Sequence, residues 1–321
     1  MKAYKYLCSN QYIRKGLVQV NNLLFHYIEC LYLSRIKVNL PYRPLFVIGA
    51  PRSGSTLITQ VITDAFDIGY LSNFHCQFFG APVLADKLFH PLNVKKPSEY
   101  TSEYGNTKEP YAPAECGEFW YRFFCRTPAY ITIDDVKDNK MNYFRRTVSA
   151  LTKAQDRPVL FKNLFATLRI RPINKYIPEA LFIVIKRDVV DNGHSILQGR
   201  MQVHGDYRLW WSVPPPEVEI LQNLPPEQQV IEQIRQLHAL IERDIEEGKI
   251  DANRFLTISY EAFCSDVYGQ LERVDEFFQM HGMKVKRLFN VPTTFSKVNK
   301  IKIDPDLYKK MVDYSESKNM I

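Results

Sequence analysis

The most constraining feature of this 321-residue sequence is a loop of small residues between a predicted strand and a predicted helix. The strand is the apolar run at residues 45–48, and apolar residues at helical spacing indicate a helix over residues 57–65. Between them, residues 49–56 read Gly-Ala-Pro-Arg-Ser-Gly-Ser-Thr. Such a loop presents backbone N–H groups that lack intrahelical partners, and the helix dipole adds partial positive charge. The sequence therefore predicts a phosphate or sulfate site here.

The residue types of the loop point to the same kind of ligand. Gly49 and Gly54 allow close approach to the backbone, and Arg52 adds a full positive charge. The anion-binding residues that we expect are Arg52, Ser53, Gly54, Ser55 and Thr56. The alternative to an anion site is a turn between strand and helix in which the small residues only allow close packing.

The loop also approaches the pattern G-x-x-x-x-G-K-[ST] of nucleoside triphosphate enzymes. Gly49, Gly54 and Thr56 match it, but position 55, where the pattern has lysine, is a serine. That lysine contacts the terminal phosphates, so its absence argues against a P-loop kinase acting on nucleotides or small molecules. Such a kinase and a non-catalytic nucleotide-binding module are the alternatives that the sequence leaves open.

Predicted strands and helices alternate along the rest of the chain. Continuous apolar runs, typical of strands buried on both faces of a parallel sheet, lie at residues 158–161 and 180–185, and a further strand candidate lies at residues 255–260. Helical patterns lie at residues 166–177, 226–247 and 266–281. The sequence thus predicts an α/β fold with a P-loop-like parallel sheet flanked by helices on both faces. We expect one domain over residues 1–321, with an N-terminal helical segment at 1–43 and an aromatic-rich insertion over the sheet at 80–155.

Residues 51–57, Pro-Arg-Ser-Gly-Ser-Thr-Leu after a strand, resemble the 5′-phosphosulfate loop of sulfotransferases that use 3′-phosphoadenosine 5′-phosphosulfate (PAPS). Arg187 at the end of a predicted strand, followed by Ser195 in the next helix, is similar to the 3′-phosphate site of that family. Ligands bind at the carboxyl ends of parallel strands, and the helix brings Ser195 back toward that side. The resemblance implies transfer of a sulfuryl group from PAPS to a hydroxyl, with no metal ion.

Three residues are candidates for the chemistry. Lys162, followed by Asn163 at a strand end, resembles the lysine that stabilises the bridging oxygen in tyrosylprotein-type sulfotransferases. The general base is either His75, after the helix that follows the loop, or Glu115. We favour Glu115, because residues 113–120 resemble a P-x-E-x-G-x-F-W segment of bacterial sulfotransferases.

The resemblance also implies further contacts to PAPS and a type of acceptor. It places Tyr260 beside PAPS, and Ser296 and Lys300 in a loop that closes over it. Aromatic residues within 74–130 and the pair at 210–211 could stack on sugar rings. We therefore expect the acceptor to be a saccharide or glycoconjugate.

Composition restricts the partners and the location. The net charge of +7 suits a small polyanion, and no basic stripe with interleaved aromatics indicates nucleic-acid binding. The six cysteines show neither metal-site nor disulfide-framework spacing, so we expect reduced thiols in a cytoplasmic protein. The apolar stretch at residues 17–33 is interrupted by polar residues and is too short for a transmembrane segment. The sequence indicates no oligomeric state.

Overall fold

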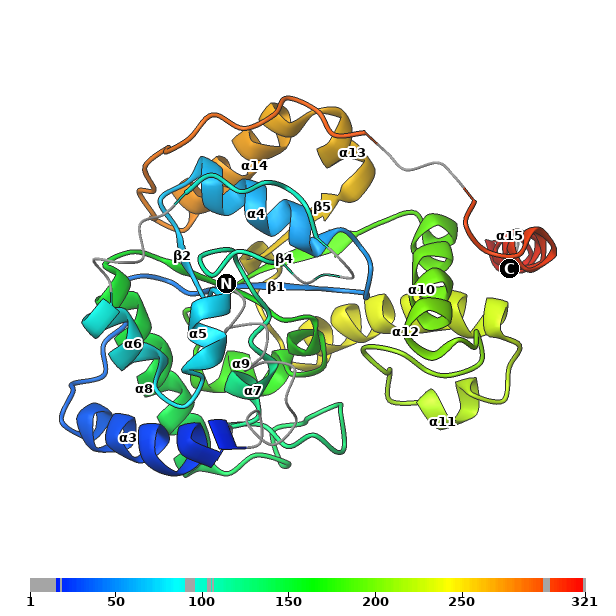
Figure 1. Cartoon of the computed structure of the whole chain (residues 1–321). Coiled ribbons are helices and arrows are strands. Elements are labelled where there is room, and N and C mark those ends of the chain that lie inside the picture. The colour runs from blue at the N-terminus through cyan, green and yellow to red at the C-terminus, as the bar shows by residue number, and fades with distance from the viewer. Residues whose placement is uncertain are drawn as a thin grey trace.

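A parallel β-sheet forms the centre of the computed structural model, which describes residues 16–17, 19–89, 96–102, 105, 107–296 and 301–319. Among these residues the strand order is β2-β3-β1-β4-β5, and all neighbouring strands are parallel (Figure 1). The strands are β1 (Leu45–Gly49), β2 (Gly69–Tyr70), β3 (Val159–Lys162), β4 (Leu181–Lys186) and β5 (Phe255–Ser259). The predicted α/β fold with a parallel sheet is confirmed.

The longer strands coincide with the continuous apolar runs of the sequence. In the central strand β1, Phe46 lies opposite Phe161 of β3 on one side and Phe182 of β4 on the other. Every residue of β1 is buried, which explains why its sequence is apolar throughout instead of alternating. The sequence did not predict β2, because a strand of two residues is too short to show a recognisable pattern of apolar residues.

Helices cover both faces of the sheet (Figure 1). One layer contains α4 (Ser55–Ala65), α13 (Tyr260–Ser265) and α14 (Val267–Met280). The opposite layer contains α3 (His26–Ser34), α6 (Pro82–Phe89), α7 (Gly117–Trp120), α8 (Asp138–Gln155) and α9 (Ile170–Tyr176). The remaining elements are the π-helix η1 (Asn21–Phe25), α5 (Asn73–Gln77), η3 (Leu164–Leu168), α10 (Val189–His204), α11 (Val218–Leu221), α12 (Pro226–Glu247), η4 (Ala252–Arg254) and α15 (Pro305–Asn319).

The aromatic-rich insertion packs into the core on the α8 side of the sheet. Phe119, Trp120 and Phe123 are at most 2% exposed. The rings of Phe119 and Trp120 lie 6.2 and 5.9 Å from that of Phe161 in β3. These rings are therefore core residues, and they do not form the sugar-stacking surface that the sequence suggested.

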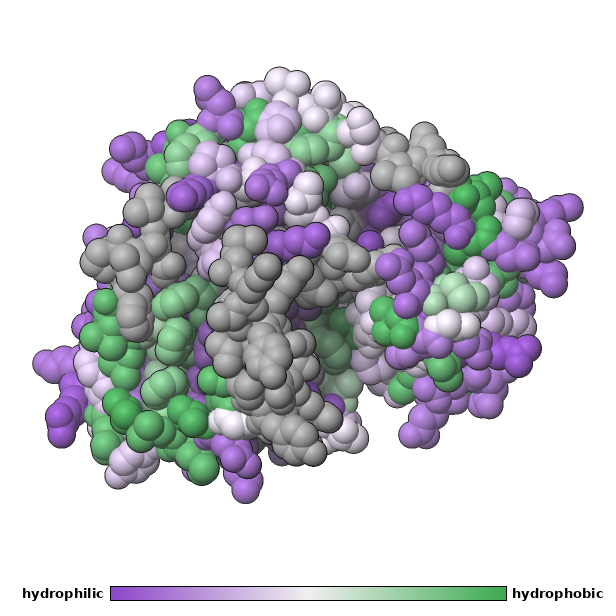
Figure 2. Space-filling model, viewed as in Figure 1, coloured by the Kyte–Doolittle hydropathy of each residue, from purple (hydrophilic) through white to green (hydrophobic). Residues whose placement is uncertain are grey.

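The N-terminal helical segment turns its regularly spaced apolar residues outward. These residues are 42–62% exposed: Leu17, Val20, Leu24, Tyr27, Ile28 and Leu31. Figure 2 shows hydrophobic side chains gathered over α3, at the lower left of the view. The opposite side of the segment, with Asn21, Glu29 and Leu33, is buried. No helix in the described ranges is both long and apolar enough to span a bilayer.

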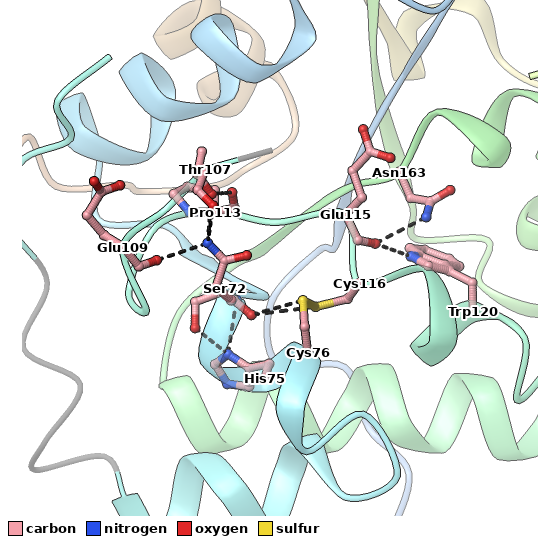
Figure 3. Close-up of a disulfide and its surroundings, with 11 residues drawn as sticks. Ser72, His75, Cys76, Thr107, Glu109, Pro113, Glu115, Cys116, Trp120 and Asn163 are labelled. Carbon is pink, nitrogen blue, oxygen red and sulfur yellow. Dashed lines mark hydrogen bonds between the residues drawn. A yellow bond between two sulfur atoms is a disulfide. The ribbon is translucent and has the colours of Figure 1, made fainter. Parts of the chain in front are cut away.

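A disulfide joins Cys76 in α5 to Cys116 before α7 (Figure 3). The expectation that all cysteines are reduced is wrong for this pair. Residues so far apart in the sequence meet because Ser72 forms a β-bridge with Pro113, which brings the two segments side by side. Their Cα atoms lie 4.9 Å apart, within the normal range for a disulfide. Because disulfides persist mainly in oxidising compartments, this bond removes one argument for a cytoplasmic location.

Removal of this disulfide is expected to destabilise the protein. The disulfide closes a loop between two cysteines that are 40 residues apart in the sequence. In the double variant C76S/C116S this loop is open, so the unfolded chain gains conformational entropy. This change corresponds to about 2–4 kcal/mol in the free energy of unfolding, measurable by urea titration. The control is Cys125→Ser, which alters an exposed free cysteine. An unchanged midpoint in the double variant would contradict the prediction.

Candidate active site

The loop after β1 owes its shape to residues with left-handed backbone angles. Arg52 and Gly54 have φ angles of 64° and 88°. Helix α4 begins at Ser55, with Gly54 as its N-cap. Left-handed residues in a tight turn direct backbone N–H groups toward a common point, where the helix dipole adds positive potential. The loop therefore has the backbone shape that an anion site needs.

Gly54 also allows an aromatic ring to lie directly against the loop. A Cβ at Gly54 would lie 2.1 Å from Cδ2 of Tyr260, the first residue of α13. Burial raises the pKa of Tyr260 to about 12. The Arg187 guanidinium lies over the same ring, 4.8 Å from its centroid, which is a cation–π contact.

Contacts from the segment after β4 hold this loop in place. Arg187 Nη1 donates a hydrogen bond to the Arg52 carbonyl at 3.1 Å. Arg52 Nε donates to Ser195 Oγ at 3.1 Å. Asn192 Nδ2 donates to the Pro51 carbonyl at 2.6 Å. Since β1 and β4 are neighbours, the structure brings Arg187 and Ser195 together with the loop.

A cavity of about 860 Å³ opens beside the loop, a volume typical of small-molecule sites. Most of the residues that the sequence assigns to PAPS binding line it: Arg52, Gly54, Ser55, Thr56, Arg187, Ser195, Tyr260 and Ser296. Ser53 is fully buried within the loop. Lys300 lies outside the described residues.

Two buried donors around this cavity have no hydrogen-bond partner within the described part of the chain. They are the Ser53 hydroxyl and Nε of Arg187. A buried donor without an acceptor is unfavourable, and anionic oxygens are the strongest acceptors for such groups. The residues present therefore fit a ligand that carries phosphate or sulfate groups.

A lysine and a carboxylate meet near Thr56, and of these two residues Glu115 lines the cavity whereas Lys162 does not. Lys162 Nζ lies 2.7 Å from Glu115 Oε1. The Lys162 side chain is 2% exposed, whereas that of Glu115 is 42% exposed. The carbonyl of Gly105 accepts hydrogen bonds from Lys162 Nζ at 3.2 Å and from Thr56 Oγ1 at 3.4 Å. The structure thus brings Lys162, Glu115 and the loop to one point.

The backbone of Glu115 is held by several contacts (Figure 3). Its carbonyl accepts hydrogen bonds from Asn163 Nδ2 and from Trp120 Nε1, each at 3.1 Å. The disulfide fixes the next residue, Cys116. Because Asn163 follows Lys162 directly, one dipeptide contacts both the carboxylate and the main chain of Glu115. This arrangement fixes the carboxylate beside the ammonium group.

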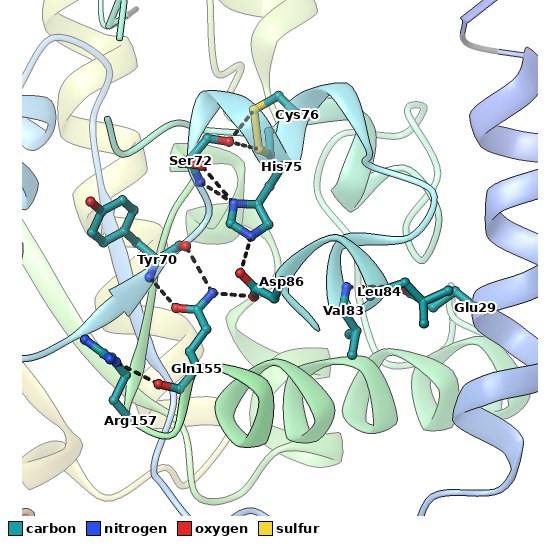
Figure 4. A network of polar contacts seen from close by, with 11 residues as sticks. Glu29, Tyr70, Ser72, His75, Cys76, Val83, Leu84, Asp86, Gln155 and Arg157 are labelled. Atoms are coloured by element: carbon teal, nitrogen blue, oxygen red, sulfur yellow. Dashed lines mark hydrogen bonds and ion pairs between the residues drawn. A yellow bond between two sulfur atoms is a disulfide. The ribbon is translucent and has the colours of Figure 1, made fainter. Parts of the chain in front are cut away.

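His75 lies apart from this group, in a buried polar network (Figure 4). Its Nδ1 accepts a hydrogen bond from the Ser72 backbone at 3.0 Å, and its Nε2 lies 2.8 Å from Asp86 Oδ1. The other oxygen of Asp86 accepts from Gln155 Nε2 at 2.8 Å. His75 is 3% exposed and does not line the cavity. The structure therefore brings Lys162 together with Glu115 but not with His75.

Sequence reasoning missed several polar residues that line the cavity, namely His194, Gln198, Gln202, Ser212 and Lys302. Nε2 of His194 accepts a hydrogen bond from the Lys302 backbone at 3.0 Å, and burial lowers the pKa of His194. The sequence spacing of Gln198 and Gln202 from Ser195 could have indicated that these two residues line the same site. Residues three and seven positions apart share one face of a helix.

Comparisons with known proteins identify the family of the chain. The model of a sulfotransferase family matches residues 44–281, well over half of the chain, and the chain therefore belongs to that family. No curated protein sequence matches the chain significantly.

Two solved structures share the fold. One is the sulfotransferase STF9 from Mycobacterium avium, with a TM-score of 0.54 and 14% identity over 92% of this chain and 73% of that one. The other is the sulfotransferase STF1 from Mycobacterium tuberculosis H37Rv, with a TM-score of 0.52 and 14% identity over 95% and 80%. Membership of a sulfotransferase family favours sulfuryl transfer over the phosphoryl transfer of a kinase and over a non-catalytic module.

The packing of Gly54 against Tyr260 predicts a strong effect of Gly54→Ala. A left-handed alanine costs about 1–2 kcal/mol of stability, and the clash with the ring adds about 1–3 kcal/mol. Gly282→Ala is the matched control, because Gly282 has a φ angle of 70° with no neighbour within 4 Å. Urea unfolding of both variants measures the difference. Equal losses would show that the Tyr260 ring imposes no steric constraint.

Proposed function

We propose that this sulfotransferase takes its sulfuryl group from PAPS and transfers it to a hydroxyl of an acceptor. The observation that supports this proposal is one cavity lined by residues of the 49–56 loop, Arg187, Ser195 and Glu115, whose carboxylate pairs with Lys162. PAPS carries one anionic group on its 5′ side and one phosphate on its 3′ side. The cavity offers cationic and hydroxyl donors for both.

The loop binds the 5′-phosphosulfate in this proposal. Its backbone N–H groups and the hydroxyls of Ser53, Ser55 and Thr56 surround the anion. Arg187 and Ser195 contact the 3′-phosphate, and Ser296 and Lys300 belong to the loop that closes over PAPS. Tyr260 packs beside the nucleotide between these two groups.

Lys162 and Glu115 carry out the chemistry in this proposal. The acceptor oxygen forms a bond to sulfur while the bond from sulfur to the bridging oxygen breaks, and adenosine 3′,5′-bisphosphate leaves. The Lys162 ammonium stabilises the negative charge that develops on the bridging oxygen. The Glu115 carboxylate accepts the proton of the acceptor hydroxyl. We assign Glu115 this role over His75, because both ring nitrogens of His75 are engaged outside the cavity.

We further propose that the acceptor is a saccharide or glycoconjugate. The cavity wall beyond Ser195 combines the indole of Trp211 with Gln198, Gln202 and Ser212. Aromatic faces beside amide and hydroxyl groups suit a ring that carries several hydroxyls. Of the aromatic residues in 74–130 within the described ranges, only Tyr100 lines the cavity. The proposal of a saccharide acceptor therefore depends mainly on Trp211 and its polar neighbours and not on the aromatic residues of the insertion.

The first test of the proposed donor is nucleotide specificity. We expect adenosine 3′,5′-bisphosphate to bind more tightly than 5′-AMP in calorimetry, because only the former reaches Arg187 through its 3′-phosphate. Arg187→Ala should weaken the bisphosphate by about 2 kcal/mol, or about thirtyfold in Kd. Arg126→Ala is the control, since Arg126 pairs with Glu118 in an exposed ion pair. Equal affinities for the two nucleotides would contradict the assignment of the donor.

The second test separates chemistry from binding. Lys162→Ala should lower kcat by about 10²–10³-fold, because the charge that it stabilises develops only in the transition state. Glu115→Gln should lower kcat by about 10²–10⁴-fold through loss of the base. Turnover is measured at saturating PAPS with the best acceptor from a panel of saccharides and simple alcohols.

The control for this test is His75→Gln, which should lower stability while kcat stays near the wild-type value. A large kcat loss in His75→Gln with a normal Glu115→Gln would reverse the assignment of the base. If Lys162→Ala lost only affinity for PAPS, Lys162 would be a binding residue.

A further inference from the structure

The N-terminal helical segment has an outer face of seven exposed apolar residues: Leu17, Val20, Leu23, Leu24, Tyr27, Ile28 and Leu31. Their exposure ranges from 42% to 76%. Figure 2 shows this patch over α3, and exposed apolar groups of this extent usually mark an interaction site. A helix on a protein surface normally turns its apolar side to the core, so the outer face needs an explanation.

Polar contacts on the inner side fix this orientation. Glu29 is fully buried, and its carboxylate accepts hydrogen bonds from Arg122 at 3.1 Å and from the Val83 backbone at 2.9 Å (Figure 4 shows the Val83 contact). Asn21 Nδ2 donates to the Gln77 carbonyl at 2.9 Å, and Asn21 Oδ1 accepts from the Gly80 backbone. Rolling the helix to bury its outer face would expose these partners and leave Arg122 unpaired. The fold therefore holds the apolar side outward by specific contacts.

The described residues beside the outer face include several cations. Residues 1–43 contain seven basic residues, and Glu29, which is paired with Arg122, is their one acidic residue. Of the basic residues, Arg35 and Lys37 follow α3 directly and are exposed. On the neighbouring helix α6, Lys87 Nζ lies 5.0 Å from the centre of the Tyr32 ring. The apolar strip thus has cations at its end and beside it.

This combination fits a lipid surface better than a second copy of the chain. In a symmetric dimer through the outer face, the cations of the two copies would approach one another without acidic partners from these segments. An anionic bilayer offers both acyl chains for the apolar strip and phosphates for the cations. From Leu17 to Leu31 the strip is about 21 Å long, which suits a helix lying in the plane of the interface.

We propose that the outer face is a docking site for an anionic membrane surface. The helix lies flat, with Leu23, Leu24 and Ile28 among the acyl chains and Arg35 and Lys37 at the headgroups. This inference does not depend on the proposed donor or acceptor, because none of the residues that carry it lines the cavity.

The experiment is co-sedimentation of the full chain with vesicles. Vesicles of phosphatidylcholine mixed with phosphatidylglycerol should bind the protein about tenfold more strongly than vesicles of phosphatidylcholine alone, and added salt should weaken this binding. Leu24→Gln/Ile28→Gln should reduce binding to the mixed vesicles by about tenfold or more. The matched control is Ile220→Gln/Met280→Gln, which changes two residues that are each 67% exposed elsewhere on the surface.

Two results would overturn the proposal. One is the absence of vesicle binding, or equal binding to both kinds of vesicle. The other is a dimer in light scattering that Leu24→Gln/Ile28→Gln converts to a monomer while vesicle binding is unchanged, which would make the outer face a self-interface. Circular dichroism should show that both double variants keep the fold, because all four positions are exposed.

Discussion

The parallel pairing of β1 with β3 and β4 is the interaction on which the candidate site depends. Parallel strands end at one edge of the sheet, so the 49–56 loop, Lys162 and Arg187 leave three neighbouring strands at the same place. The absence of a side chain at Gly49 keeps β1 close to β4, since a Cβ there would lie 2.5 Å from the Ile185 carbonyl oxygen. Hydrogen bonds donated to the loop by Arg187 and Asn192, and one donated by Arg52 to Ser195, then complete a site whose position the sheet has already determined.

The sequence predicted those features of the fold that depend on residues close together in the chain. Short runs of β-branched and aromatic or apolar residues predicted four of the five strands among the described residues, and the small-residue loop predicted the strand–loop–helix turn. The ion pair of Lys162 with Glu115 and the Cys76–Cys116 disulfide were beyond such reasoning. They depend on how the insertion returns to the sheet, which involves contacts between residues far apart in the chain. His75 shows the same limit, because only its packing against Asp86 distinguishes a buried network residue from a base.

Two of the ion pairs made by residues of the insertion differ in a way that matches their proposed roles. Glu29 and Arg122 are almost completely buried, and the removal of either charge would leave the other unpaired inside the protein. Such a pair fixes one orientation of a helix. Lys162 is equally buried, but its partner Glu115 is partly exposed toward the cavity. A carboxylate held at the mouth of a cavity by a buried lysine remains accessible to a substrate hydroxyl.

One short segment connects the candidate site with the outer face of the N-terminal helices. Trp120 donates its indole N–H to the carbonyl of Glu115, and Arg122, two residues further on, binds Glu29 and the Phe79 carbonyl. The residues from 115 to 122 therefore hold the proposed base at one end and the buried side of the docking helix at the other. Because the Trp120 ring is locked among the core aromatics, this connection is rigid. A bilayer that binds the outer face would thus hold the carboxylate of Glu115, the proposed base, at a fixed position relative to the membrane.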